Sequence, residues 1–396
     1  MLDPSPPEPA PTIDLTDLHA VAVLGRGAKG VVFDVCTSSE TLALKVISRS
    51  SVEQKSGGAA ENGGSGAYKR VWFERDVLLS LHHPLLPALR GVVSTDKIIG
   101  FAIDRCSGGD LNSLRRRQTE QMFSDDTIRF YAAEMVLALE YLHGLGIIYR
   151  DLKPDNVLIQ DNGHIMLVDF DLSTKIPLQS PEPPSLHATP PAPQAPSSKK
   201  KKKGRFLSCL SCNADVSPES SDPPAGPPIS GSDHGSCKSN SFVGTEEYVA
   251  PEMITGNGHD YGVDWWSLGI VLYEMLYGRT PFRGVNRKET FYRILSKSPE
   301  LVGEKTVLRE LIGSLLEKDP EKRIGCEGIK GHEFFRGVDW ESLLLISRPP
   351  YIPSGADRED SKELIDVEKV VQDVFGDGAM NNNNNKTLKN DDFSHF

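Results

Sequence analysis

Apolar and polar residues alternate on both sides of a glycine-rich segment near the N-terminus. Val21 and Val23 precede the glycines, and Val31, Phe33 and Val35 follow them. Such alternation is typical of strands that bury one face. The pattern predicts a hairpin of two strands, with the glycines in the loop that joins them.

Four later segments also have regular apolar patterns. Residues 43–46 predict a further strand, and residues 165–168 predict a short apolar strand. Residues 73–79 lie at the start of a helical pattern, and residues 264–269 open a long helix. The chain therefore combines strands and helices.

Two segments have no apolar periodicity. Residues 50–67 are rich in Gly, Ser and Ala and predict a flexible insertion before a helix. Residues 172–240 are dominated by Pro, Ser and Ala. Such a segment buries too little surface to offset the entropy of ordering, so we expect it to be disordered.

Composition and charge agree with a globular protein that carries such insertions. With 396 residues and 38% hydrophobic content, the chain can bury the cores of two lobes. The segment 172–240 has eight basic and five acidic residues, a net charge of +3, which leaves −14 for the rest of a chain whose total is −11. A specific nucleic-acid-binding module is excluded, because the rest is strongly acidic and no aromatic residues interleave the lysines.

The chain has no signal for export or membrane insertion. No apolar run has the length that spans a bilayer, and the N-terminus lacks a basic region followed by an apolar stretch. The six cysteines are scattered and form no disulfide framework. We expect a soluble, intracellular protein of the cytoplasm, the nucleus or both.

Several short motifs that carry chemistry occur in one order along the chain. They are G-x-G-x-x-G-x-V at 25–32, Lys45 on the next strand, Tyr-Arg-Asp-Leu-Lys-Pro-Asp-Asn at 149–156, Asp-Phe-Asp at 169–171 and Ala-Pro-Glu at 250–252. A glycine triplet alone also makes ordinary turns, but the ordered set indicates phosphoryl transfer. That reaction requires charges held around a nucleotide and an incoming hydroxyl, and these residue types supply them.

With these motifs the chain resembles the eukaryotic serine/threonine protein kinases of the AGC group. It is most similar to the plant members that carry Asp-Phe-Asp and a long insertion before the activation loop, and among them to the oxidative-signal-inducible type. Residues 239–252 and 348–353 match that subgroup. The resemblance implies a monomeric enzyme that transfers phosphate from ATP to serine or threonine of protein substrates, with a signalling role in oxidative-burst or defence responses upstream of mitogen-activated kinases.

The resemblance also implies an α+β fold with two lobes. A small antiparallel sheet with one major helix forms the first lobe, and the second lobe is larger and mainly helical. The expected divisions are a disordered N-terminus at 1–17, the small lobe at 18–106, the large lobe at 107–336 and a C-terminal tail at 337–396.

Four residues of the catalytic motifs carry the expected reaction. Asp151 orients the substrate hydroxyl, Lys153 faces the transferring phosphate, and Asn156 and Asp169 hold Mg²⁺. Asp171 replaces the glycine that usually follows Asp-Phe. Because Asp adopts positive φ only with strain, we expect this segment to change conformation less easily.

ATP binding is expected mainly in the small lobe. Lys45 grips the α- and β-phosphates, and Glu74 is its expected anionic partner, with Asp76 as the alternative that is a solvated surface carboxylate. Asp110 matches a ribose contact. The remaining expected contacts come from the glycine segment: Leu24, Gly25, Arg26, Gly27, Ala28, Lys29, Gly30, Val31 and Val32.

Regulation is expected at two places. Arg150 has an unpaired charge in such kinases until a phosphate arrives, and Ser241 stands where that phosphate belongs. Ser239 is a weaker alternative, and either residue can instead be an ordinary loop serine. At the C-terminus, Phe393 and Phe396 form a Phe-x-x-Phe ending that in related kinases recruits the upstream phosphoinositide-dependent kinase, although it can also be a plain apolar tail.

Acidic residues of the large lobe suggest a substrate preference. Asp110, Asp155 and Glu274 match positions that in AGC kinases face arginines before the acceptor residue, and we expect basic sites to be preferred. Each acid can instead be a solvated surface residue. Thr245 lies where the loop shapes the acceptor site.

Three interpretations of the basic insertion stay open. The run Lys199–Lys203 is a solvated tether, a nuclear import signal or a contact with an anionic membrane, which would add peripheral plasma-membrane binding. Cys209 and Cys212 lack the two further ligands of a zinc site, and they are candidates for acylation. The rival function for the whole chain is a pseudokinase scaffold, but Lys45 and the catalytic acids are all retained.

Overall fold

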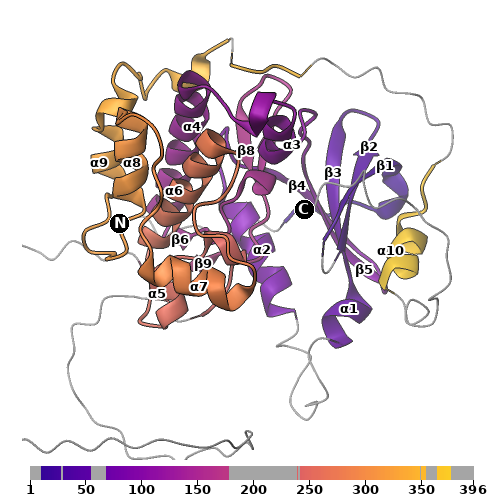
Figure 1. The fold of residues 1–396 in the computed structure, drawn as a ribbon. Coiled ribbons are helices and arrows are strands. Elements are labelled where there is room, and N and C mark those ends of the chain that lie inside the picture. Colours follow the sequence, from indigo (N-terminus) through magenta and orange to yellow (C-terminus); the bar gives the residue numbers. More distant parts are fainter. Residues whose placement is uncertain are drawn as a thin grey trace, which may run out of the picture. The chain divides into compact units, whose positions relative to one another are not determined.

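The computed structural model describes residues 10–27, 30–54, 68–177, 239, 241–347, 349–353 and 364–375. All of them belong to one compact unit, formed by the chain before residue 178 and after residue 236. In this unit an antiparallel sheet forms one lobe and helices build most of the other (Figure 1). The expected two-lobed α+β fold is confirmed.

The small lobe is built on a five-stranded sheet with the strand order β1-β2-β3-β5-β4. Its strands are β1 (His19–Arg26), β2 (Gly30–Cys36), β3 (Thr41–Ser48), β4 (Leu89–Ser94) and β5 (Ile98–Asp104). The predicted hairpin is present, with Val23 opposite Phe33. Gly30 is required where the hairpin meets β3, because a Cβ atom there would lie 2.0 Å from the carbonyl oxygen of Val46.

Helix α2 (Lys69–Ser80) covers one face of this sheet. Its Val71, Val77 and Leu78 are buried in the same core as Phe101 of β5. The helical pattern predicted at 73–79 lies inside α2. This helix carries Glu74 on its buried side, which turns that carboxylate toward the interior between the lobes.

A helix of the C-terminal tail covers the other face of the sheet. Helix α10 (Val367–Phe375) buries Val367 and Val371 in one cluster with Leu44 of β3, on the side away from the large lobe (Figure 1). The chain enters α10 through a β-bridge in which the Ile365 amide donates to the carbonyl oxygen of Ala20 at 3.0 Å. Sequence analysis missed this helix, although its valines are spaced i, i+3, i+4 and i+7.

The large lobe consists mainly of helices. They are α3 (Leu111–Arg116), α4 (Asp125–Gly144), α5 (Pro251–Thr255), α6 (Gly262–Tyr277), α7 (Arg287–Ser296), α8 (Val307–Leu315) and α9 (Cys326–Lys330). Helix α6 is the helix predicted to open at 264–269, and it is almost entirely buried. Among the described helices, none has the length and apolar character needed to cross a membrane.

Two short antiparallel pairs and several single turns position the loops between the lobes. The strand pairs are β6 (Ile147–Ile148) with β9 (Thr174–Lys175), and β7 (Val157–Ile159) with β8 (Ile165–Leu167). The 3₁₀ turns lie at Leu15–Asp17, Thr119–Gln121, Pro154–Asn156, Glu246–Tyr248, Glu333–Phe335 and Leu343–Leu345. The catalytic motif at 149–156 thus lies between two strand pairs.

The structure differs from the expectation in three segments. Strand β9 (Thr174–Lys175) lies inside the segment expected to be disordered at 172–240. The insertion predicted to be flexible at 50–67 begins as helix α1 (Arg49–Gln54), and its residues 55–67 lie outside the described part. The expected disordered N-terminus includes Thr12, which forms a parallel bridge with Val92 of β4. Backbone pairing with the sheet edge orders this segment, and such pairing has no local sequence signal.

Candidate active site

Asp151 lies at the centre of the catalytic motif and is almost fully buried. One carboxylate oxygen accepts a hydrogen bond from the Thr245 hydroxyl at 2.8 Å. The other accepts from the Lys153 ammonium and from the Asn156 amide, both at 2.9 Å. These donors hold the carboxylate in one orientation, which a group that aims a substrate hydroxyl requires.

A buried carboxylate on α6 fixes the backbone of this loop. Asp264 accepts from the amides of Tyr149 at 2.9 Å and Arg150 at 2.7 Å, and it contacts His143 Nε2 at 2.8 Å. Arg150 has a φ angle of 69°, a left-handed conformation that is unfavourable for a non-glycine residue. Asp264 offsets that strain, and sequence analysis missed this role because only the tertiary fold brings α6 to the loop.

Lys45 joins the small lobe to the large lobe. Its ammonium lies 2.6 Å from Glu74 and 2.7 Å from Asp169. Burial opposes the charge on Lys45, but the two carboxylates outweigh burial and raise the pKa of Lys45 well above its ordinary value. The alternative partner, Asp76, is 61% exposed and pairs with Arg75 instead. The structure therefore places Glu74 rather than Asp76 at this lysine.

Two oxygen donors in the site fit a divalent cation. Asn156 uses its amide nitrogen on Asp151, and its buried Oδ1 has no hydrogen-bond partner among the described atoms. Asp169 adds a carboxylate, whose pKa burial would raise but Lys45 lowers. Hard oxygen ligands of this kind suit Mg²⁺. An unpartnered buried oxygen is unfavourable unless a ligand satisfies it, so the pair fits a divalent metal ion.

Asp171 does not adopt positive φ in this conformation, and the expected restriction on conformational change of this segment stays a prediction. In the segment 169–171 the positive φ angle belongs to Asp169, at 62°, and Asp171 is not among the residues with positive φ. The replacement of glycine at position 171 therefore causes no backbone strain in this arrangement.

Two side chains of the glycine segment lie on the side of the sheet that α10 covers. Val31 is buried with the outer-face cluster of the sheet, and the guanidinium of Arg26 lies over the ring of Phe375 in α10, at 5.6 Å. Both side chains thus face the tail helix. The backbone of the loop closes through the Gly27 amide, which donates to the Gly30 carbonyl at 2.9 Å.

Asp110 is occupied as a helix cap in this structure. Its carboxylate accepts from the amide of Ser113 at 2.7 Å and from the hydroxyl of the same residue at 2.6 Å. This is the N-cap arrangement that stabilises the first turn of α3. The expected ribose contact would have to share these oxygens.

Arg150 faces the two candidate regulatory serines. Its NH1 donates to the Ser241 hydroxyl at 2.5 Å and lies 3.3 Å from the Ser239 hydroxyl. Burial and the nearby Arg70 of α2 lower the pKa of Arg150 to about 10. The guanidinium of Arg150 at the Ser241 hydroxyl favours an anion at that position.

The three acids expected to face substrate arginines differ in their surroundings. Glu274 forms a buried ion pair with Arg115 at 2.9 Å and accepts from Tyr248. Asp155 accepts from the neutral amide of Asn112 at 3.0 Å. Asp155 and Asp110 accept from neutral donors, so both offer carboxylate charge that a substrate cation could still neutralise.

Several predicted residues lie outside the part of the chain that the structure describes. They are Ala28 and Lys29 of the glycine loop, the run Lys199–Lys203, Cys209 and Cys212, and the terminal Phe393 and Phe396. Within the described part, groups of three or more His, Cys, Asp or Glu residues suited to a metal ion are absent.

Comparison with known proteins relates this chain to one family of enzymes. The protein kinase domain family matches residues 18–192 and 230–335. These ranges include the sheet, the catalytic motif and most helices of the large lobe.

Individual relatives are similar over most of the chain. Serine/threonine-protein kinase OXI1 of Arabidopsis thaliana is 56% identical, over 95% of this chain and 91% of its own length. Serine/threonine-protein kinase UCNL of Arabidopsis thaliana is 41% identical, over 90% of this chain and 88% of its own. Phototropin-2 of Oryza sativa subsp. japonica is 40% identical over 85% of this chain, which corresponds to 34% of that longer protein.

Proposed function

Because the chain belongs to the protein kinase domain family, as a serine/threonine protein kinase of the plant AGC type, we propose that its buried Asp151 cluster directs ATP-dependent phosphorylation of proteins. The observation that carries this proposal is the convergence of Thr245, Lys153 and Asn156 on Asp151, within 2.9 Å of its carboxylate. A carboxylate held by donors on several sides is suited to align an alcohol for attack.

Each group in the site has a separate part in the transfer. Asp151 accepts the hydrogen bond of the substrate hydroxyl and orients its oxygen toward the γ-phosphate. Lys153 neutralises charge on the phosphoryl group in transit, and Lys45, kept charged by Glu74, grips the α- and β-phosphates. Asn156 and Asp169 would hold Mg²⁺, which neutralises phosphate charge when it is bound.

We infer a preference for acceptor sites that follow arginine. Asp155 supports it, because its carboxylate is paired with a neutral amide, whereas Glu274 already has Arg115. An array of peptides with Arg or Gln before the acceptor, incubated with Mg²⁺ and ATP, should show about threefold to tenfold faster phosphorylation of the Arg peptides. Asp155→Asn should reduce that ratio. Equal rates for the Arg and Gln peptides would contradict the inferred preference for acceptor sites that follow arginine.

We propose that phosphorylation of Ser241 activates the enzyme. The hydroxyl of Ser241 lies 2.5 Å from Arg150, so a phosphate there would add charge-assisted hydrogen bonds to a buried cation. After incubation with a phosphoinositide-dependent kinase, Ser241→Ala should phosphorylate a peptide at least about tenfold more slowly than wild type, since one such bond contributes about 1.5 kcal/mol.

Ser239→Ala is the matched control for this experiment, because Ser239 lies farther from Arg150, at 3.3 Å. It should be activated like wild type. Full activation of Ser241→Ala would contradict the proposed regulatory role of Ser241. If only Ser239→Ala lost activation, Ser239 and not Ser241 would be the regulatory phosphorylation site.

We further propose that Phe393 and Phe396 recruit the upstream kinase. Support comes from the family resemblance, and from helix α10, which anchors the tail to the small lobe before this ending.

We propose that the enzyme acts in the cytoplasm or the nucleus, and that Lys199–Lys203 can bring it to an anionic membrane. We also propose a signalling role in oxidative-burst or defence responses upstream of mitogen-activated kinases.

A further inference from the structure

The surface around α7 exposes more large apolar side chains than any other described segment of similar length. Val285, Tyr292, Leu295 and Val302 are exposed within 18 residues of chain, with Val285 at 88% and Tyr292 at 58%. The activation segment adds Phe242, whose ring meets that of Phe291 on α7 at 5.8 Å. We call the exposed residues between 285 and 302, with Phe242, the α7 surface. Clustered exposed apolar residues of this kind mark interaction sites.

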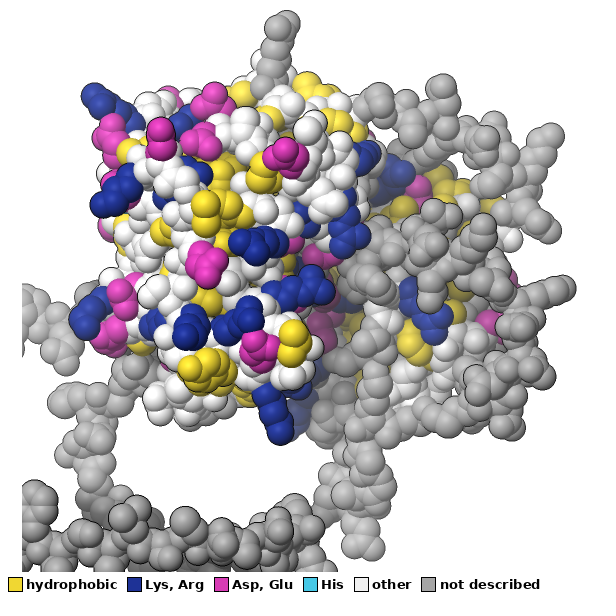
Figure 2. Space-filling model, viewed as in Figure 1, with side chains coloured by type: hydrophobic (Ala, Val, Ile, Leu, Met, Phe, Trp, Pro, Cys, Tyr) yellow, Lys and Arg dark blue, Asp and Glu magenta, His cyan; other side chains and the backbone are white. Residues whose placement is uncertain are grey.

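The same surface is basic in an acidic protein. Residues 285–302 contain four basic residues and two acidic residues, a net charge of +2, whereas the whole chain carries −11. Of the two acids, Glu300 lies beyond the end of α7, and Glu289 is paired with Arg293 at 2.5 Å. Lys288, by contrast, is exposed on the helix. Basic and apolar side chains lie together over the region of α7, with fewer acidic ones between them (Figure 2).

Cations on this surface are already arranged over aromatic rings. The guanidinium of Arg287 lies 5.0 Å from the ring of Phe291 and 5.5 Å from that of Phe242, and the ammonium of Lys297 lies 5.9 Å from the ring of Tyr292. Stacking keeps these cationic groups against the aromatic rings, so that their side chains do not extend into water. A partner can therefore contact a cation and an aromatic ring at the same position.

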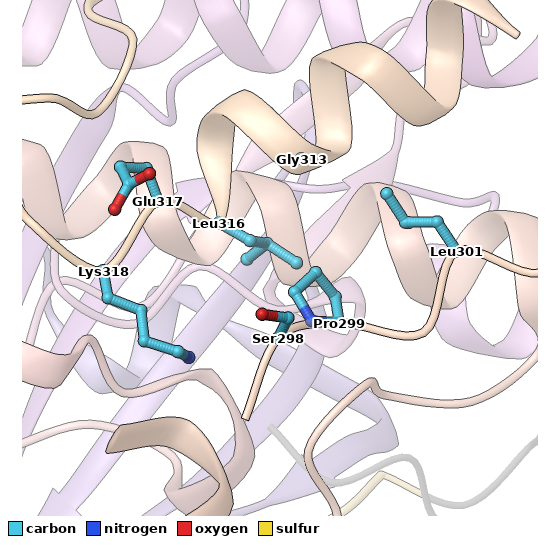
Figure 3. Close-up of a pocket in the computed structure, with 7 residues that line it drawn as sticks. All are labelled: Ser298, Pro299, Leu301, Gly313, Leu316, Glu317 and Lys318. Atoms are coloured by element: carbon cyan, nitrogen blue, oxygen red, sulfur yellow. The ribbon is translucent and has the colours of Figure 1, made fainter. Parts of the chain in front are cut away.

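A pocket opens at the C-terminal end of α7, two residues after the helix ends. It has a volume of about 390 Å³ and is lined by Pro299, Leu301 and Leu316 among others (Figure 3). Lys318 also lines it, but its ammonium donates to the carbonyl of Ile294 at 2.6 Å, so that charge is engaged within the protein. Glu317 adds a negative charge to the wall. The pocket is therefore suited to an apolar group and unsuited to an acidic one.

The length of α7 sets the distance between the basic residues near its start and the pocket beyond its end. Helix α7 has 10 residues, so its two ends are about 15 Å apart. An extended peptide covers that distance with about five residues. One apolar side chain in the pocket would thus place acidic residues about five positions away, near Lys288.

We propose that the α7 surface is a docking site for a protein partner that presents an apolar anchor residue and acidic residues about five positions from it. The apolar residue enters the pocket beside Leu316, and the acidic residues lie against Arg287 and Lys288. Hydrophobic anchoring supplies affinity, and the charges select the partner and orient it. This docking is separate from the transfer reaction and does not depend on the catalytic residues.

The test is a selection of phage-displayed random 16-residue peptides on the immobilised full-length kinase. Enriched peptides should have an excess of Asp and Glu, with an apolar residue about five positions from the acidic ones. A synthetic peptide of the enriched sequence should bind wild type and lose at least about tenfold in affinity to Lys288→Glu and to Leu295→Glu. Both changed residues are exposed, so the variants should melt at the wild-type temperature.

Two matched variants separate this site from general surface effects. Arg336→Glu reverses an exposed charge elsewhere, and Leu345→Glu changes an 81% exposed leucine elsewhere. Both should bind the selected peptide like wild type. The proposal is overturned if no peptide is enriched, if the enriched peptides have no acidic excess, or if the variants of α7 bind as tightly as the controls. Because binding is measured without ATP, failure here leaves the kinase assignment untouched.

Discussion

Asp169→Asn should lower peptide phosphorylation by at least about 100-fold while the protein stays folded. The substitution removes the negative charge that lies 2.7 Å from Lys45 and leaves a neutral amide where a carboxylate would bind Mg²⁺. Loss of a single electrostatic contact to a transferring group already lowers turnover by about 10²–10³. The measurement is initial rate with an arginine-containing peptide, Mg²⁺ and saturating ATP, combined with a thermal melt.

Asp126→Asn provides the matched control for this change. Its carboxylate is 90% exposed on α4 and, within the described part of the chain, pairs with Arg129 at the surface, so rate and melting temperature should stay near wild type. If Asp169→Asn kept more than about a tenth of wild-type activity, the role of Asp169 at the phosphates would be wrong.

Arg323→Met should lower the free energy of unfolding by about 3–5 kcal/mol, because it leaves a carboxylate buried without its counter-ion. The two guanidinium nitrogens of Arg323 bind the two oxygens of Glu252 at 2.6 and 2.9 Å, and both side chains are nearly inaccessible to solvent. Arg323 also donates to the carbonyl of Gly262 at 2.8 Å and thereby ties the Ala-Pro-Glu motif to the start of α6. Urea unfolding at neutral pH measures the loss.

A double variant distinguishes a lost ion pair from a lost packing contact. Adding Glu252→Gln to Arg323→Met removes the unpaired charge and should restore part of the stability, as a double-mutant cycle would show. Arg336→Ala breaks an exposed pair with Glu333 and should change the stability by less than about 1 kcal/mol. If Arg323→Met and Arg336→Ala had the same free energy of unfolding, the buried pair of Arg323 and Glu252 would not stabilise the fold more than an exposed pair does.

The local sequence was sufficient to predict the parts of the site whose residues lie close together along the chain. Asp151, Lys153 and Asn156 lie within six residues, so their meeting around one carboxylate is a property of a single loop. The hairpin around the glycines likewise follows from alternation along two adjacent strands.

Sequence patterns do not show which distant groups a side chain contacts. The side chain of Arg26 lies over Phe375, and the carboxylate of Asp110 caps α3. The expected contacts of both residues with the nucleotide stay predictions. The tail helix α10 and the ordered residues near Thr12 were missed because each is stabilised by the sheet and not by its own propensity.

The sequence by itself determined the family, the hairpin around the glycines, and the residue types that phosphoryl transfer requires, because these depend on periodicity and on fixed local spacing. The tertiary structure alone decided that Asp264 holds the catalytic loop and that basic and apolar residues gather beside a pocket at α7. The physical reason is that burial and charge pairing act between surfaces that meet only when the chain has folded.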